Sequence, residues 1–268
     1  MKKSIPQYLP PYTIRWKDEP PFPVTWEEMM GWFIVPKLGE TLTWGMYDLP
    51  SRKLDVAYDM AVTGKAKVHG IEGVSFTARV IQPYDPLKAD DMMNKPVEDS
   101  GAVQEEWTFI AQLAQGHTRF LSAERNEDGC RTLNTFLDEE FMNNWGFGEN
   151  NCGNDIHCIP RGIIHRTGSV ITSDREKVID VAGRCEVVLD GKPHDCICVM
   201  DLSQYNEDCI SEQYLGRDGR TVLWRRFNRD DWAIDRYGKP WSVLLPDNEQ
   251  LTVNGQTYVH WYDCLCIR

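Results

Sequence analysis

The stretch CEVVLDGKPHDCICVM, residues 185–200, decides how we interpret the fold. Hydrophobic and polar side chains alternate on either side of Asp190 and Gly191, which is the pattern of half-buried strands. An Asp-Gly dipeptide tolerates the positive φ angles of a two-residue hairpin turn. The segment therefore predicts an antiparallel β-hairpin that pairs residues 185–189 with residues 195–200.

The same hairpin signal recurs twice in the second half of the chain. Asp218 and Gly219 lie between apolar runs at 210–215 and 221–227, and Asn254 and Gly255 lie between 251–253 and 257–266. In the first half, strands with a period of two are predicted at 54–62, 74–80 and 107–113, with a return strand through 120–121. Gly70 and Gly73 are expected in the loop of the first of these hairpins.

A succession of hairpins predicts a mainly β protein. We expect an antiparallel curved sheet of about eight to ten strands, shaped as a barrel or half-barrel, with a two-sheet sandwich as the alternative. Long loops are expected at 143–154, which is rich in Asn and Gly, and at 229–241.

The first 24 residues contain six prolines, which predict an extended, irregular arm over the surface of the domain. Thr25 followed by Glu28 is a capping box, and it predicts a short N-terminal helix that ends at Pro36. The predicted organisation is an arm at 1–24 and a single β-rich domain at 25–268.

Composition narrows the classes of function. The chain of 268 residues has a formal net charge of -12, which disfavours binding to nucleic acid. No stretch approaches the roughly 18 apolar residues of a membrane span, and prolines interrupt the N-terminal region where a signal peptide would lie. Nine cysteines, an odd number, favour reduced thiols. These features predict a cytoplasmic protein that is not associated with membranes.

Cysteine and histidine gather in one segment, at Cys152, Asp155, His157, Cys158 and His165. These side chains are typical zinc ligands, and a Cys-His pair is also the basis of thiol nucleophiles. The spacing matches no zinc finger, and adjacent residues of an extended chain point to opposite sides. We therefore predict no metal site and no cofactor. A cysteine- or metal-dependent enzyme that uses residues 152–165 remains an alternative.

Two Cys-x-Cys pairs, Cys196 with Cys198 and Cys264 with Cys266, lie on predicted strands. Residues two apart share a face of a strand, and free cysteine packs as a small hydrophobic side chain. Core packing is the favoured interpretation. Four thiols on neighbouring strands would form a soft-metal site, which is the alternative.

The arginine-rich run at 217–229 is interpreted as a solvated hairpin paired with acidic neighbours. Phosphate-binding, dinucleotide-binding, zinc-protease and hydrolase motifs are absent from the sequence, so whether the protein is an enzyme stays open.

The leading hypothesis is a non-catalytic intracellular protein that holds a small, partly apolar ligand in its curved sheet. A third hypothesis is a protein-interaction module that presents Trp232 and Trp241. The residues expected to form the wall of the ligand site are aromatic or basic side chains on predicted strands: Trp107, Phe109, Trp224, Arg226, His260 and Tyr262.

Overall fold

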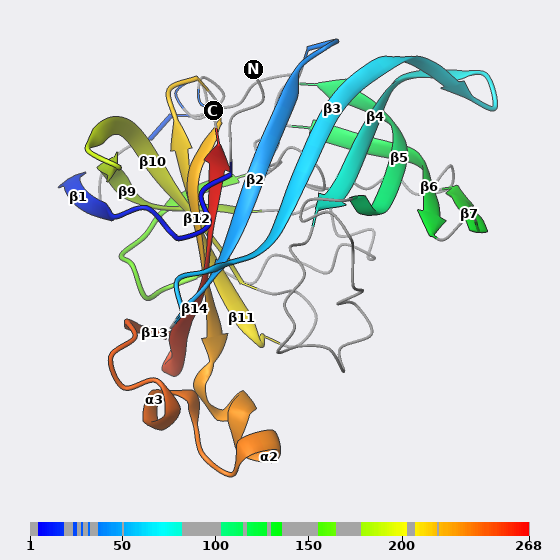
Figure 1. The fold of residues 1–268 in the computed structure, drawn as a ribbon. Coiled ribbons are helices and arrows are strands. Elements are labelled where there is room, and N and C mark those ends of the chain that lie inside the picture. Colours follow the sequence, from blue (N-terminus) through cyan, green and yellow to red (C-terminus); the bar gives the residue numbers. More distant parts are fainter. Residues whose placement is uncertain are drawn as a thin grey trace.

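The computed structural model describes residues 5–18, 24–25, 28, 32, 37–49, 51–81, 103–114, 117–127, 130–135, 155–164, 178–202, 207–218 and 220–267. Most of them form a single sheet of 14 strands (Figure 1). The strands are β1 (Tyr12–Asp18), β2 (Thr41–Asp48), β3 (Leu54–Val68), β4 (Ile71–Ile81), β5 (Val103–Ala114), β6 (His117–Glu127), β7 (Cys130–Thr135), β8 (Asp155–Cys158), β9 (Val178–Leu189), β10 (Lys192–Leu202), β11 (Cys209–Gly216), β12 (Thr221–Arg229), β13 (Gln250–Val253) and β14 (Gln256–Ile267). The short helical segments are η2 (Asp230–Ala233), α2 (Ile234–Tyr237) and α3 (Trp241–Leu244).

The strand order is β1-β9-β10-β11-β12-β14-β2-β3-β4-β5-β6-β7, with β13 paired to β14 and β8 paired to β9. All of these pairings are antiparallel except that between β8 and β9. Sequential hairpins build both halves, β3 to β7 and β9 to β12, and β14 with β2 joins them in the middle (Figure 1). The prediction of a mainly β protein with a curved antiparallel sheet is confirmed, and the sheet is open rather than a closed barrel.

The hairpin turns follow from the dipeptides that predicted them. Asp190 and Gly191 have φ angles of 48° and 74°, and Asn254 and Gly255 have φ angles of 50° and 81°. Both residues of each turn therefore adopt the left-handed conformation that a type I′ turn requires. Gly219 lies outside the described residues, but β11 and β12 pair around it as predicted.

The turn between β3 and β4 differs from the prediction. His69 and Gly70 form it, with φ angles of 47° and 83°, while Gly73 pairs with Ala66 inside the ladder. The sequence suggested a loop that included Gly73. An added Cβ on Gly73 would lie 2.7 Å from the carbonyl oxygen of Ala111, so this glycine permits close approach of β5 rather than a turn.

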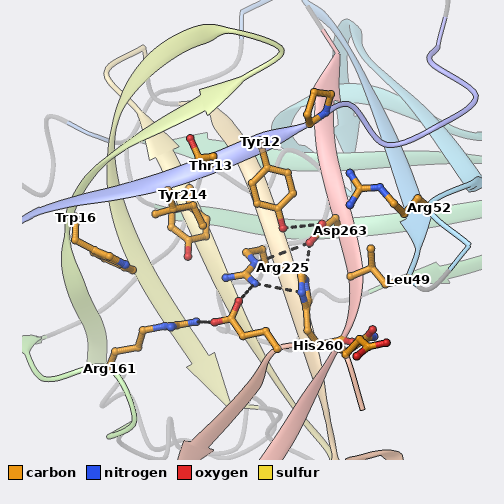
Figure 2. A pocket seen from close by; sticks show the side chains of 15 residues that line it. Tyr12, Thr13, Trp16, Leu49, Arg52, Arg161, Tyr214, Arg225, His260 and Asp263 are labelled. Atoms are coloured by element: carbon orange, nitrogen blue, oxygen red, sulfur yellow. Dashed lines mark hydrogen bonds and ion pairs between the residues drawn. The ribbon is translucent and has the colours of Figure 1, made fainter. Parts of the chain in front are cut away.

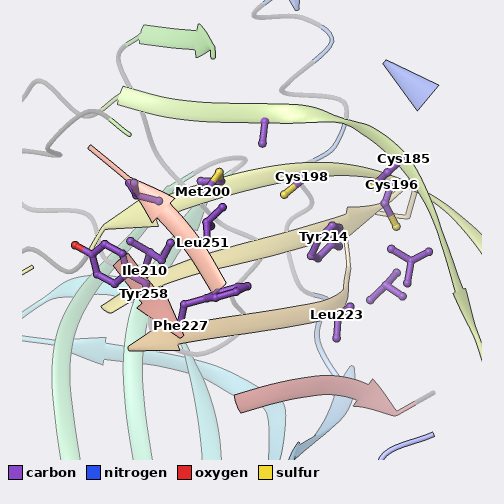
Figure 3. Packing of buried hydrophobic residues seen from close by; sticks show 14 of the residues in the cluster. Cys185, Cys196, Cys198, Met200, Ile210, Tyr214, Leu223, Phe227, Leu251 and Tyr258 are labelled. Carbon is purple, nitrogen blue, oxygen red and sulfur yellow. The ribbon is translucent and has the colours of Figure 1, made fainter. Parts of the chain in front are cut away.

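The core lies on both faces of the central strands. Leu265 of β14 packs in a cluster with Tyr214, Leu223 and Phe227. Figure 3 shows the last three of these side chains within the cluster. On either side of Leu265, Cys264 and Cys266 pack in a second cluster, which also contains Trp44 and Phe109. Because successive residues of a strand point to opposite faces, β14 is buried on both sides.

Of the predicted arm at residues 1–24, the structure describes residues 5–18 and 24, and within this part β1 is a regular strand. It pairs with β9, and further upstream the amide of Leu9 donates to the carbonyl of Arg52 at 2.8 Å. The amide of Leu54 likewise donates to the carbonyl of Gln7 at 3.0 Å. The segment thus runs from the β9 edge of the sheet to the connection between β2 and β3.

The predicted N-terminal helix falls mostly outside the described residues, as does the predicted loop at 143–154. The capping contact is present, since the amide of Glu28 donates to Oγ1 of Thr25 at 3.1 Å. The region expected as a loop at 229–241 contains η2, α2 and the start of α3 instead. Gly238 ends α2 with a φ angle of 70°, and Asp230 accepts a hydrogen bond from the Ser242 amide at 2.6 Å.

Candidate functional site

A pocket of about 830 Å³ lies between β1 and strands β11, β12 and β14 (Figure 2). Its lining combines aromatic, aliphatic and charged side chains: Pro11, Tyr12, Thr13, Ile14, Trp16, Leu49, Arg52, Arg161, Tyr214, Arg225, Asp247, Asn248, Glu249, His260 and Asp263. The volume is within the range of sites that hold a whole small molecule.

Strand β1 provides the apolar wall of the pocket. Its residues alternate, so that Tyr12, Ile14 and Trp16 are half-buried while Arg15 and Lys17 are exposed. The three half-buried side chains also pack against the first core cluster. The wall is therefore held in place by the core on one side and by the β9 ladder along its edge.

The opposite wall contains three buried ionisable side chains, and a fourth pairs with one of them. Arg225, His260 and Asp263 line the pocket and are exposed by 5%, 6% and 1%, and Glu212, which pairs with Arg225, is exposed by 0%. Burial of charge is costly unless every group is paired and hydrogen-bonded. The partners of these four residues therefore determine what the site can do.

Glu212 and Glu249 join two arginines, Arg161 and Arg225, into one network, and Figure 2 shows both arginines at the pocket. Nη1 of Arg225 lies 3.2 Å from Oε2 of Glu212, and Nη2 of Arg161 lies 2.7 Å from Oε1 of Glu249. Arg161 also pairs with Glu212, and Arg225 also pairs with Glu249. The hydroxyl of Tyr214 donates to Glu212 at 2.7 Å. Each guanidinium thus pairs with both glutamates, and Nε of Arg225 also lies 4.0 Å from Oδ1 of Asp263.

These ion pairs shift the pKa values of their members. Burial alone would raise the pKa of Glu249, but the positive charge of Arg225 and that of Arg161 outweigh it and lower this pKa to about 2. Burial alone would lower the pKa of Arg161, whereas Glu212 and Glu249 raise it overall. Both groups are consequently charged at neutral pH.

His260 lies between Asp263 and Arg225. Its Nε2 is 2.6 Å from Oδ1 of Asp263, and its Nδ1 is 3.2 Å from Nη2 of Arg225. A guanidinium can only donate, so Nδ1 accepts and the proton is on Nε2, which we assign from this hydrogen-bond pattern. The imidazole is neutral in this arrangement, and it stacks on Phe227 with ring centroids 4.8 Å apart.

Tyr12 connects the two walls. Its hydroxyl donates to Oδ2 of Asp263 at 2.8 Å, across the space between β1 and β14. Burial, with the adjacent Asp263 carboxylate, raises the pKa of Tyr12 well above its ordinary value despite the opposing charge of Arg225. The phenol is therefore a hydrogen-bond donor that stays protonated.

A β-bulge places His260 and Asp263 on the same face of β14. Arg226 pairs with Tyr262, but the next residue, Phe227, pairs with His260, which leaves Trp261 as the additional residue. In a regular strand, residues three apart would point to opposite faces. Strict alternation groups His260 with Tyr262 and misses the contact with Asp263.

Of the five predicted wall residues whose side chains the structure describes, only His260 lines the pocket. Phe109 belongs to the second core cluster, and Trp224 packs against that cluster. Arg226 and Tyr262 are register partners, and the Tyr262 hydroxyl donates to Asp55 at 3.0 Å. The side chain of Trp107 lies outside the described residues. A ligand-binding role for the six remains a prediction.

The structure corrects the interpretation of the arginine-rich hairpin as solvated. Arg220 and Arg225 are buried, with 4% and 5% exposure, although their partners are acidic as expected. Arg225 points to the interior because it shares a face with Leu223 and Phe227. The predicted pairing of 210–215 with 221–227 already places Glu212 opposite Arg225, and this signal could have identified the pair.

The cysteine alternatives are only partly described. Cys152 and His165 lie outside the described residues, and so do the side chains of Asp155 and His157. Cys158 is half-buried, and burial raises the pKa of its thiol. Among the residues that the structure describes, no group of three His, Cys, Asp or Glu side chains could hold a metal ion. The alternative of an enzyme that uses residues 152–165 stays untested.

The Cys-x-Cys pairs are buried in two separate core clusters, as the packing interpretation predicts. Their strands, β10 and β14, are separated by β11 and β12 in the sheet, so the pairs do not combine into one metal site. Trp232 is 52% exposed, whereas Trp241 is buried and contacts Trp261 with ring centroids 4.2 Å apart. Only Trp232 of the predicted interaction pair is therefore on the surface.

No protein-family model matches the sequence, and no curated protein matches it. Two solved structures match the chain. One is a protein from Bacteroides fragilis, described as exported and as having a YmcC-like fold, with 11% identity, a TM-score of 0.34 and coverage of 88% of this chain and 97% of that chain. The other is described as a lipoprotein from Parabacteroides distasonis, with 8% identity, a TM-score of 0.30 and coverage of 87% and 96%. We base no functional argument on matches this weak.

The predicted cytoplasmic location is corrected. The two matched proteins are described as exported and as a lipoprotein, which contradicts that location. The number of cysteines does not decide the compartment, because buried cysteines such as Cys198 and Cys264 pack as small hydrophobic side chains. We assign no location in its place. Within the part of the chain that the structure describes, no helix has the length and apolar character to cross a membrane.

Proposed function

We propose that the protein binds a small molecule in the pocket between β1 and strands β11, β12 and β14. The observation that carries this proposal is the set of three buried ionisable side chains that line the pocket, Arg225, His260 and Asp263, together with the fully buried Glu212 that pairs with Arg225. Apolar residues at such positions are often as stable or more stable, so stability alone does not explain this wall. A partly apolar, partly polar pocket fits a ligand that has both kinds of surface.

Binding without catalysis is supported by the hydrogen bonds of His260 and Asp263, the groups of the site that are able to transfer protons. Both ring nitrogens of His260 are engaged, and Asp263 accepts from His260 and Tyr12. A general base must reach the proton that it removes, and these groups contact one another instead. The site is therefore better suited to hold a ligand than to transform it.

The test is native mass spectrometry after incubation with the low-molecular-mass fraction of a cell extract. In the variant Ile14→Trp the indole would fill the pocket, whereas Arg15→Trp adds the same bulk on the exposed face of β1. Asp247→Trp, at the exposed rim, is a second blocking variant that does not disturb the core.

We expect a mass excess on the wild type and on Arg15→Trp that both blocking variants lose while their circular dichroism spectra stay unchanged. A wild type that retains no small molecule, or one whose bound mass survives in both blocking variants, would refute binding in this pocket.

A further inference from the structure

The charges that line the pocket are equal in number. Arg52, Arg161 and Arg225 contribute three guanidinium groups, and Asp247, Glu249 and Asp263 contribute three carboxylates. Glu212, which is buried and pairs with Arg161 and Arg225, adds a fourth carboxylate beside the pocket. The charges around the pocket therefore differ by only one carboxylate, and the field favours neither anions nor cations strongly.

Two of the three guanidinium groups that line the pocket are matched with carboxylates. Arg161 and Arg225 each pair with Glu212 and Glu249, so an anionic ligand would compete with these carboxylates for the two guanidinium groups. A cationic ligand would compete with the same arginines for Glu249. In either case, a buried charge would lose its partner, which is costly.

A hydroxyl group avoids this cost, because it donates one hydrogen bond and accepts others. It can bridge the edge of a guanidinium and the oxygen of a neighbouring carboxylate without separating them. Arg161 and Glu249 present such a pair to the pocket, with Nη2 and Oε1 2.7 Å apart and side chains 27% and 39% exposed. Asn248 adds an amide that can likewise donate and accept.

The wall formed by β1 can pack against the C–H groups of the same ligand. Tyr12 and Trp16 present aromatic rings from β1, and Ile14 lies between them along the strand. Figure 2 shows Tyr12 and Trp16 extending from β1 toward the side of the charged network. A ring with hydroxyl groups at its rim and C–H groups on its faces would meet both walls at once.

From this pairing of walls, we infer that the ligand is an uncharged, hydroxyl-rich ring compound of the saccharide class. The inference rests on the proposed function, because it specifies the ligand of the same pocket.

The experiment is isothermal titration calorimetry of the full chain with two sets of probes. The first set contains neutral hexoses, N-acetylhexosamines, pentoses and their disaccharides, and the second contains amino acids and inorganic phosphate. We expect heat from members of the first set only, with an affinity that changes less than about twofold between about 0.05 and about 0.5 M NaCl, since the ligand has no charge to screen.

Variants locate the binding to the aromatic wall. Trp16→Ala should weaken the sugar affinity about tenfold, and Trp16→Phe should restore most of it, because a ring is again available. Trp232→Ala removes an exposed tryptophan outside the pocket and should leave the affinity unchanged.

Heat from amino acids or phosphate in the absence of heat from sugars would overturn the inference and leave the proposed function standing. The same holds if the molecule recovered from the extract by the wild type is charged or lacks hydroxyl groups. If no probe binds and no molecule is recovered, the proposed function fails as well.

Discussion

The variant Glu212→Gln tests the buried network most directly. In the wild type, the side chain of Glu212 is fully buried and accepts hydrogen bonds from Arg161, Arg225 and Tyr214. Glutamine keeps the shape but removes the charge, so both arginines depend on Glu249, which is 39% exposed. Loss of one partner of a buried ion pair costs about 3–5 kcal/mol. For Glu212→Gln we expect the unfolding free energy to fall by about 3 kcal/mol, because the glutamine amide oxygen still accepts one hydrogen bond.

In a protein of this size, each kcal/mol lowers Tm by about 2–4 °C, so Glu212→Gln should melt about 6–12 °C below the wild type. Thermal unfolding at pH 7, followed by circular dichroism, measures this difference. Glu72→Gln is the matched control: Glu72 pairs with Lys67 at 2.9 Å, but the two side chains are 79% and 63% exposed. Its Tm should change by no more than about 1–2 °C.

A double variant distinguishes two causes of a lower stability: the loss of an ion-pair partner, and the general effect of a substitution in the core. Glu212→Leu combined with Arg225→Met removes both charges, so it should lose less stability than the two single variants lose in sum. Equal melting temperatures for Glu212→Gln and Glu72→Gln would refute the reasoning. Strict additivity of the two core substitutions would refute it too.

Three further predictions follow from the pKa shifts and backbone angles. The folded pKa of Glu249, about 2, lies below its ordinary 4.5, so its contribution to stability is present above about pH 4.5 and is lost toward pH 2. The Tm difference between the wild type and Glu249→Gln should therefore shrink as pH falls through this range. Burial raises the pKa of Cys185 and that of Cys264, so iodoacetamide at pH 8 should label these thiols only after unfolding. Peptide mass spectrometry measures the labelling, and labelling in the native state would contradict their burial. Gly191→Ala should lower Tm by about 2–4 °C. Gly191 has a φ of +74° and no atom near the position of an added Cβ, so the loss of about 1 kcal/mol in unfolding free energy comes from the backbone conformation alone. Gly64→Ala, with ordinary φ and equally open space, is the control, and an equal loss in both variants would exclude the backbone explanation.

Local patterns explain why much of the sheet could be predicted from sequence. A hairpin is specified by its turn residues and by alternation along two adjacent strands, and both signals lie within about 20 residues of chain. The pairing of β9 with β10 and that of β11 with β12 follow from Asp190-Gly191 and Asp218-Gly219 in this way. The burial of the Cys-x-Cys pairs follows from the same alternation.

Features that break alternation or join distant segments were not predictable by these rules. The bulge at Trp261 reverses the orientation of the residues that follow it, and no glycine or proline marks it. The helical turns after Arg229 lack an apolar repeat long enough to indicate a helix. The pairings of β1 with β9 and of β14 with β2 have no turn sequence, because they depend on tertiary packing.

The location of the pocket could not be predicted, because it depends both on a break in alternation and on the pairing of distant segments. Tyr12 and Asp263 are 251 residues apart in the chain, and their hydrogen bond requires both the long-range placement of β1 and the bulge in β14. A prediction from alternation on single strands selects residues that share one local face, such as Trp224 with Arg226. The charged network at the pocket instead combines Arg225 and Asp263 of the wall with Glu212, which pairs with Arg225, so it joins three strands and exists only when the register of the whole sheet is set. The pocket is consequently a property of the folded sheet, and substitutions that shift the β14 register should abolish it even where every lining residue is retained.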